Sequence, residues 1–94
     1  MRLKEFFAPD AVAVVGAGRD PRNLGRAIVR NIVASGYPGP VYPINPHATE
    51  IEQLRAYPSV LDVPGPVELA VVAVPALVVP TVVEECGRKG VRGL

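Results

Sequence analysis

The sequence has few of the residues that define disulfide-bonded or metal-binding domains. It contains one cysteine, Cys86, one histidine, His47, and no tryptophan, and aromatic residues make up only 5% of the chain. A single cysteine excludes an internal disulfide and a thiolate zinc cluster. This cysteine usage fits a cytoplasmic protein.

The chain also lacks long apolar runs and a charge excess of one sign. The first ten residues are mixed and charged, unlike a signal peptide, and no run is long enough to span a membrane. The net charge of +1 gives no global attraction to nucleic acid or to an anionic membrane, so we expect neither partner. Four arginines do fall close together, which indicates either a solvated helix face or a phosphate-binding patch: Arg19, Arg22, Arg26 and Arg30.

What the chain does have is a normal apolar fraction, 49%, interrupted by 11 prolines and 9 glycines. Ninety-four residues allow one domain, which we take to be residues 1–94. The prolines and glycines separate apolar runs rather than forming a low-complexity tract. We find no internal repeat.

The central stretch is Val12–Gly25, which reads VAVVGAGRDPRNLG. An apolar run ends at Gly16, Gly18 follows two residues later, and an apolar-periodic segment begins after Gly25. This order predicts a strand, a glycine-rich turn and a helix. Such a turn can bring backbone N–H groups close to a phosphate, and the helix start adds further N–H groups. Glycines after strands also occur for steric reasons alone, so the turn does not identify a ligand.

The remaining elements alternate between strands and helices. A possible first helical turn covers Leu3–Phe7. Strands are predicted at Ala11–Val15, Val41–Ile44 and Leu69–Val74, with a short one near Leu54–Ala56. Helices are predicted at about Asn23–Ser35 and Leu77–Arg88, and Ser59 is expected to cap a single turn that ends at Asp62.

The helix patterns predict which residues are buried. The first helix has an apolar stripe formed by Leu24, Ala27, Ile28 and Ile32. The second has one formed by Val79, Val82, Val83 and Cys86, with Pro80 tolerated in its first turn. Cys86 is therefore expected to be buried and inert.

Together these elements predict an α/β, Rossmann-like fold in which a parallel sheet of four or five strands has helices on both faces. Val91–Leu94 resembles the start of another strand, so we expect the sheet to be truncated at its C-terminal end and the chain to be a fragment of a longer protein. Loops at the carboxyl ends of parallel strands meet at one edge, where ligands collect. Three loops are expected there: Gly16–Gly25, Asn45-Pro46 and Pro75-Ala76.

The motif details argue against a nicotinamide dinucleotide. The fingerprint GxGxxG needs a third glycine where this chain has Pro21. No acidic residue stands at the tip of the second strand to bind ribose hydroxyls, and no basic residue stands there for NADP. The phosphate-binding motif GxxxxGK[ST] is also absent. An NAD(P)-binding domain stays a less favoured alternative.

Several blocks together resemble one family. These blocks are FFAPDAVAVVGAGRDPRNLG, GPVYPINP, AYPSVLDVPGPVELAVVAVPA and VVEECGRKGV. They resemble the CoA-binding domain of the NDP-forming acyl-CoA synthetases, of the ADP-forming acetate–CoA ligase type, which are distant relatives of the succinyl-CoA synthetase alpha subunit. The resemblance covers almost the whole chain, with the blocks in the family order.

The resemblance implies a Rossmann-like domain that binds coenzyme A at its strand tips. Residues such as Asn23 and Ser59 are more often helix caps than ligands, and Asn45 is equally explained as a turn residue. Gly18 stands where the family usually has serine, so a hydroxyl contact to phosphate is lost. The implied binding residues are Gly16, Ala17, Gly18, Arg19, Asn23, Gly25, Asn45, Pro46, Ser59, Val74, Pro75 and Ala76.

The resemblance also implies a ligase in which this domain performs no chemistry alone. The phosphorylated histidine and the nucleotide-binding domain of such synthetases lie further along their chains. His47 lies in a polar loop without a supporting partner, so we assign it no catalytic role. The expected partners are CoA or acyl-CoA and downstream synthetase domains or subunits. The alternative is a free-standing CoA-binding or regulatory module.

Overall fold

The computed structural model describes residues 10–94 and shows a three-stranded parallel sheet. Strand β1 (Val12–Val15) lies in the centre, between β2 (Val41–Ile44) and β5 (Leu69–Val72). Val12 pairs with Val41 on one side and with Leu69 on the other. The adjacent, parallel arrangement of the two most apolar strands is confirmed, but the expectation that both are central is wrong for β5, which lies at the edge of the three-stranded sheet. The possible turn at Leu3–Phe7 lies outside the described residues.

The sheet is smaller than expected in two respects. Residues 10–94 form three strands in it rather than four or five, and the last segment contributes a single parallel bridge between Gly93 and Leu69. Strand β5 ends at Val72 instead of Val74. The N–H of Ala73 still donates to the carbonyl of Val15 at 2.8 Å, and Pro75 then prevents further pairing because it has no N–H.

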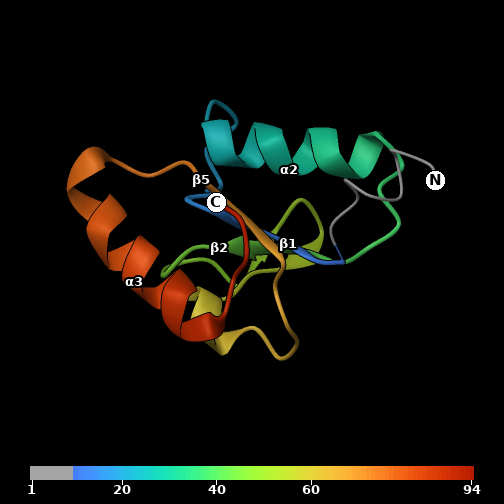
Figure 1. Cartoon of the computed structure of the whole chain (residues 1–94). Coiled ribbons are helices and arrows are strands. Elements are labelled where there is room, and N and C mark those ends of the chain that lie inside the picture. The colour runs from blue at the N-terminus through green and yellow to red at the C-terminus, as the bar shows by residue number, and fades with distance from the viewer. Residues whose placement is uncertain (1–9) are drawn as a thin grey trace.

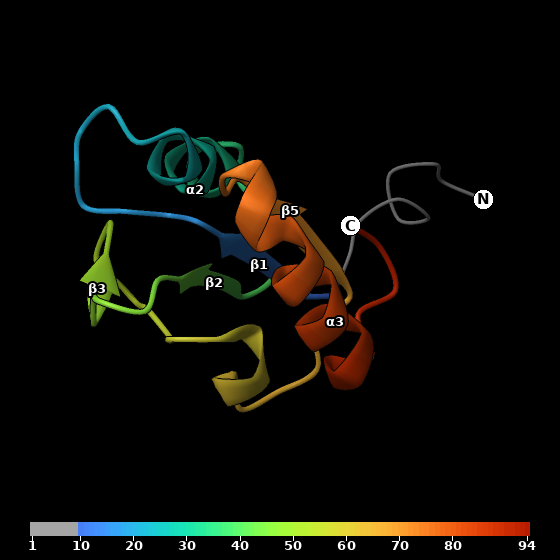
Figure 2. The same cartoon turned by 90° about the vertical axis from the view of Figure 1, so that its left-hand side faces the viewer.

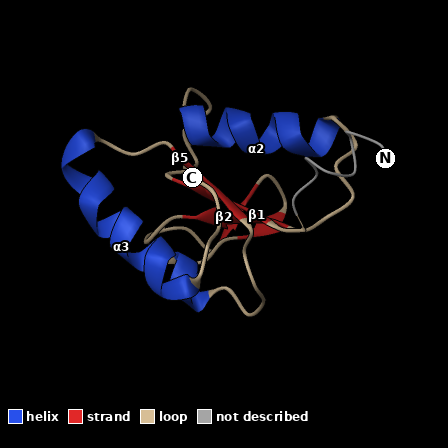
Figure 3. Ribbon diagram, viewed as in Figure 1, coloured by secondary structure: helices blue, strands red, loops and turns tan. Residues whose placement is uncertain are grey.

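One long helix packs on each face of the sheet (Figures 1 and 2). Helix α2 (Leu24–Ala34) covers the face that carries Val12 and Val14, and helix α3 (Val79–Lys89) covers the face of Ala13 and Val15. Successive strand residues point to opposite faces, so a fully apolar β1 is needed between two layers. The α/β architecture with helices on both faces is therefore confirmed (Figure 3).

In each helix, one residue of the expected apolar stripe is exposed rather than buried. In α2, Gly25 and Val29 are buried, whereas Leu24 is 66% exposed, so its assignment to the stripe is wrong. Leu24 is the first residue of the helix. In α3, Val82 and Cys86 are buried, whereas Val83 is 42% exposed. A short 3₁₀ turn, η2 (Ala76–Val78), precedes α3, which begins at Val79 rather than Leu77.

A small hairpin and a capped turn complete the fold. Strands β3 (Glu50–Ile51) and β4 (Leu54–Arg55) pair antiparallel, and Ile51 joins the core between the sheet and α2. The 3₁₀ turn η1 (Val60–Asp62) is capped by Ser59 in a reciprocal capping box with Asp62, as the sequence predicts. In the part of the chain that the structure describes, no helix is long and apolar enough to cross a membrane.

Candidate functional site at the strand tips

The glycine turn follows β1, and its glycines are required by the close approach of the chain to itself. Gly16 has a φ of +98°, and a Cβ there would lie 2.2 Å from the carbonyl oxygen of Ala73. A Cβ on Gly25 would lie 2.7 Å from the backbone of Ala17. The first contact holds the turn against the end of β5, and the second brings α2 against the turn. The position that a Cβ would occupy on either glycine is therefore already filled by the chain itself.

Asn23 links the glycine turn to the start of α2. Its Oδ1 accepts hydrogen bonds from the backbone N–H of Gly18 and from that of Arg26, both at 2.8 Å. The second bond is the helix cap that the sequence predicts. Because Gly18 donates to Asn23, its N–H is already satisfied and does not point freely to a phosphate.

Asn45 performs a similar role at the tip of β2. Its Nδ2 donates to the carbonyl of Ala17 at 2.9 Å, and its Oδ1 accepts from the N–H groups of His47 (2.7 Å) and Ala48 (3.1 Å). The side chain thus forms the expected turn and also joins two loops. Its Oδ1 is thus fully used, while Nδ2 keeps a second N–H without an acceptor among the described residues.

The four arginines do not form one cationic patch, because three of them have acidic partners. Arg22 pairs with Asp20 at 3.3 Å, and Arg26 and Arg30 both pair with Glu52, at 3.4 and 2.7 Å. Arg26 also donates to the carbonyl of Arg19. The guanidinium of Arg19 has no acceptor among the described residues and is exposed. The free cation of the turn is therefore Arg19.

Open backbone donors lie beside this cation. Within residues 10–94, the N–H groups of Arg19 and Leu24 donate to no protein acceptor. Leu24 is the first residue of α2, so its N–H lies at the positive end of the helix dipole. These two donors and the Arg19 side chain suit an anion at the outer side of the turn.

An apolar cleft of about 170 Å³ lies at the strand tips, next to the glycine turn. Gly16, Asn45, Pro46 and Val74 line it, so four of the predicted site residues are brought together there. The start of α2 and the start of α3 lie at this same end of the sheet (Figure 1). Loops after three different strands therefore meet as the fold predicts.

The other predicted residues lie around this cleft in different roles. Ala17 is fully buried under α2, and Pro75 and Ala76 are exposed where the chain turns into η2. The hydroxyl of Ser59 donates to Glu85 at 3.0 Å and also accepts from the N–H of Leu61 at 3.1 Å. Ser59 therefore caps its turn and holds α3, next to Pro58 in the cleft wall.

Sequence reasoning missed the wall that α3 contributes to the cleft. Val78, Thr81, Val82 and Glu85 all line it. Their spacing is that of one helix face. This helix face comes soon after Val74-Pro75, the segment that leaves the carboxyl end of β5. That position in the sequence is the signal that could have identified it.

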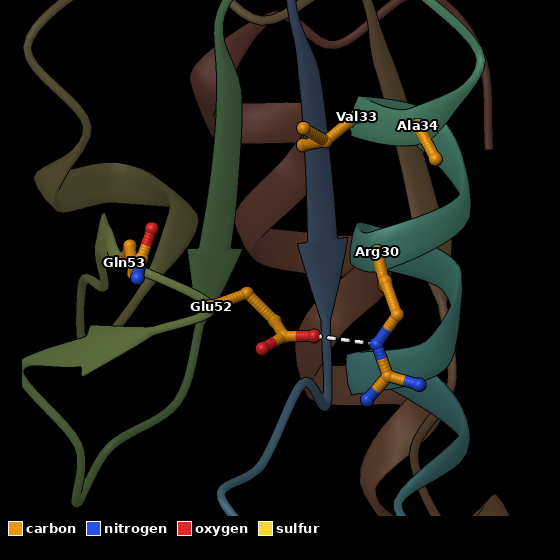
Figure 4. A pocket seen from close by; sticks show the side chains of 5 residues that line it. All are labelled: Arg30, Val33, Ala34, Glu52 and Gln53. Atoms are coloured by element: carbon orange, nitrogen blue, oxygen red, sulfur yellow. Dashed lines mark hydrogen bonds and ion pairs between the residues drawn. The ribbon is translucent and has the colours of Figure 1, made fainter.

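A separate hollow of about 360 Å³ lies between α2 and the β3–β4 hairpin (Figure 4). Arg30 and Glu52 face each other across it, and their ion pair joins the helix to the hairpin. The hydrogen bond from Arg30 holds the pKa of Glu52 below its ordinary value. Since its charges already neutralise each other, this hollow is a weaker candidate for an anionic ligand than the strand tips.

The described residues supply no obvious catalytic group at the cleft. They contain no cluster of three or more His, Cys, Asp or Glu residues that could hold a metal ion. Cys86 is one of the α3 residues that are buried in the core, as expected. Desolvation there raises the pKa of its thiol. The arrangement is that of a binding site: an apolar cleft beside a turn that offers N–H groups and a cation.

Comparison with known proteins identifies the family of this chain. The CoA-binding domain family matches residues 10–94. The chain is 46% identical over 91 residues to an ADP-forming acetate–CoA ligase II of Archaeoglobus fulgidus, a match that covers 97% of this chain and 14% of the relative. The chain belongs to the CoA-binding domain family.

Solved structures agree with this assignment. One is the dinucleotide-forming acetyl-coenzyme A synthetase 1 of Ca. Korarchaeum cryptofilum, solved with phosphate and ADP. It is 48% identical to this chain, with a TM-score of 0.89. The match covers 96% of this chain and 19% of the synthetase. A conserved hypothetical protein from Pyrococcus furiosus is 35% identical with a TM-score of 0.77; here the match covers 85% of this chain and 67% of that one. The domain thus resembles part of a large ligase and most of a small protein.

Proposed function

We propose that this chain binds coenzyme A at the strand tips and that it serves as the CoA-binding domain of an ADP-forming acyl-CoA synthetase. The observation that carries the proposal is the position of the apolar cleft beside the glycine turn. CoA is a long molecule that carries its anionic phosphates on the adenosine half, and its other half is an uncharged pantetheine arm. A site for it needs both environments side by side.

The phosphate part fits the outer side of the turn. Arg19 has a guanidinium without an acidic partner, and the N–H groups of Arg19 and Leu24 are open among the described residues. A phosphate oxygen would receive charge-assisted hydrogen bonds from these groups. The uncharged arm would lie in the cleft beside Gly16, Asn45, Pro46 and Val74. Ala17, Gly18, Asn23, Gly25 and Ser59 would then support the site through the packing and hydrogen bonds described above.

The role within a ligase rests on the relatives. The chain spans 14% of the Archaeoglobus fulgidus acetate–CoA ligase that it matches. The activation of an acid with a nucleotide would therefore belong to other domains or subunits. This proposal places the chain in the cytoplasm, where CoA and the nucleotide are available.

Isothermal titration of the chain with CoA and with NAD tests the binding proposal. We expect CoA to bind more tightly than NAD, because no acidic side chain stands at the tip of β2 to bind the adenosine ribose of NAD. Arg19→Ala should weaken CoA binding by about 1.5–3 kcal/mol, the usual value of a hydrogen bond to a charged group. Arg22→Ala is the matched control, since this arginine is already paired with Asp20 and its side chain is 91% exposed.

Two results would contradict the proposal. The first is the absence of CoA binding, and the second is NAD binding that equals or exceeds it. If Arg19→Ala and Arg22→Ala have the same effect, CoA binds elsewhere than at the glycine turn.

A free-standing CoA-binding or regulatory module is the second candidate. The match to the small Pyrococcus furiosus protein favours it, because this domain makes up 67% of that chain. The sequence that follows Leu94 in the gene separates the two candidates. A downstream histidine loop and nucleotide-binding domain support the synthetase, whereas a stop shortly after the domain supports the module.

A further inference from the structure

The cleft at the strand tips has one charged side chain in its wall, Glu85 of α3. The rest of the wall is formed mainly by valine, isoleucine and proline side chains and by Asn45 and Thr81. The amide oxygen of Asn45 already accepts from His47 and Ala48, and its Nδ2 donates to Ala17. A hydrogen-bond donor on a ligand in this cleft would therefore meet Glu85 or Thr81 rather than Asn45.

The carboxylate of Glu85 is held in place but is only partly used. The hydroxyl of Ser59 donates to its Oε2 at 3.0 Å, and Ser59 is itself fixed by the capping box at the start of η1. No other described residue donates to this carboxylate. An ionised carboxylate accepts several hydrogen bonds, so the remaining oxygen, Oε1, is open to a donor.

A carboxylate in a mostly apolar wall selects for one kind of group. It attracts N–H and O–H donors and repels phosphates, and the apolar surroundings strengthen both effects. The phosphates of a bound CoA would thus be kept out of the cleft and directed to Arg19. The pantetheine arm carries two amide N–H groups, one hydroxyl and a terminal thiol but no charge, which fits the cleft.

We propose that Glu85 is a specificity-determining residue that accepts a hydrogen bond from an amide or hydroxyl of the pantetheine arm and so fixes the direction in which CoA lies across the strand tips. This inference rests on the proposed function. It adds a role for α3 that neither the glycine turn nor the strand ends supply. Thr81, one turn earlier on the same helix face, lies beside Glu85 in the wall.

The test compares two ligands and two variants. The ligands are CoA and adenosine 3′-phosphate 5′-diphosphate, which is CoA without its pantetheine arm. Glu85→Gln keeps the size of the side chain and an oxygen that can accept from Ser59, but it removes the charge. Glu84→Gln is the matched control, because Glu84 is the adjacent residue on α3 yet is exposed and pairs with Arg88 at 3.9 Å.

For Glu85→Gln we expect the affinity for CoA to fall about tenfold, as the loss of a charge-assisted hydrogen bond implies. Its affinity for the ligand without the arm should stay unchanged or rise, because a like charge has been removed. Glu84→Gln should leave both affinities unchanged. Circular dichroism and the thermal midpoint of each variant show whether it is folded.

The outcomes separate this inference from the proposed function. If the wild-type chain does not bind CoA, the proposed function fails. If the wild type binds CoA and Glu85→Gln binds it equally well, the role of Glu85 fails while the function stands. If Glu85→Gln weakens both ligands to the same extent, the adenine part rather than the arm occupies the cleft, and the proposed direction is wrong.

Discussion

The backbone N–H of Gly18 donates to Oδ1 of Asn23, the same oxygen that caps α2 through the N–H of Arg26. One side chain therefore fixes the glycine turn and the first turn of the helix relative to each other. Any ligand that binds to both would meet a site already in its final shape. This preorganisation lowers the entropic cost of binding.

Replacing Asn23 with alanine should remove both hydrogen bonds and leave the buried N–H of Gly18 without an acceptor. We expect the free energy of unfolding to fall by about 2–3 kcal/mol, since a lost cap and an unsatisfied buried donor each cost roughly 1–2 kcal/mol. Asn31→Ala is the control, because Asn31 is exposed on α2 and alanine favours a helix. Urea denaturation measures both variants, and equal stabilities would show that Asn23 does not hold the turn.

Gly16 should tolerate no side chain, whether or not a ligand is present. A Cβ at this position would lie 2.2 Å from the carbonyl oxygen of Ala73, and the φ of +98° disfavours other residues. We expect Gly16→Ala to destabilise the fold by about 3 kcal/mol or more, as strain at such a site does. Gly87→Ala should instead stabilise α3 by about 0.5–1 kcal/mol, because a Cβ there meets no atom within 4 Å. A Gly16→Ala variant as stable as the wild type would contradict the close approach of the turn to β5.

The fold class, the central strand β1 and the caps were predictable because each depends on local sequence. The apolar run of β1, the glycines of the turn, and the caps Asn23 and Ser59 all have short-range patterns that the structure confirms. The end of β5 was less predictable, since the residues up to Val74 are apolar but the pairing with β1 already ends at Val72, ahead of Pro75.

The partners of the polar site residues were not predictable, because they come from distant parts of the chain. Ser59 meets Glu85, and Arg26 and Arg30 meet Glu52, across separations of 22 to 26 residues. The sequence left open whether the arginine cluster is a solvated helix face or a phosphate-binding patch, and it did not predict that the hairpin brings an acidic residue to two of its members. The contribution of α3 to the cleft was missed for the same reason.

The ion pairs of Glu52 should make stability depend on pH in the acidic range. Hydrogen bonding from Arg30 holds the pKa of Glu52 below its ordinary value of 4.5, so the ionised form is favoured in the folded state. The stabilising effect is therefore complete above the unfolded pKa and is lost as the pH falls through the lower folded pKa. Glu52→Gln should be less stable than the wild type at pH 7, and the difference should shrink below about pH 4.5.

Glu50→Gln is the control for this experiment, because Glu50 is exposed on β3 and has no ion pair in the described structure. Thermal unfolding from pH 3 to pH 7 measures all three proteins. A stability difference for Glu52→Gln that stays constant over this range would show that the ion pairs do not stabilise the fold.

The turn of the hairpin offers a stabilising substitution. Glu52 and Gln53 have φ values of 51° and 66°, in the left-handed region that side chains disfavour. Gln53→Gly should relieve this strain and raise the free energy of unfolding by about 1 kcal/mol, after the greater chain entropy of glycine is included. Glu52→Gly should gain less or lose stability, because it also removes the pairs with Arg26 and Arg30. Denaturation of the two variants side by side checks this order, and a destabilised Gln53→Gly would contradict it.

The most direct test of the central proposal is an NMR titration of the ¹⁵N-labelled chain with CoA, because it reports both binding and its location. We expect saturable shifts of the amide signals of Gly16 to Leu24, of Asn45, and of Val74 to Glu85, with NAD causing weaker changes at the same concentration. The signals of Arg30, Glu52 and Gln53 at the other hollow should stay in place. Shifts centred on those three residues, or none with CoA, would contradict CoA binding at the strand tips.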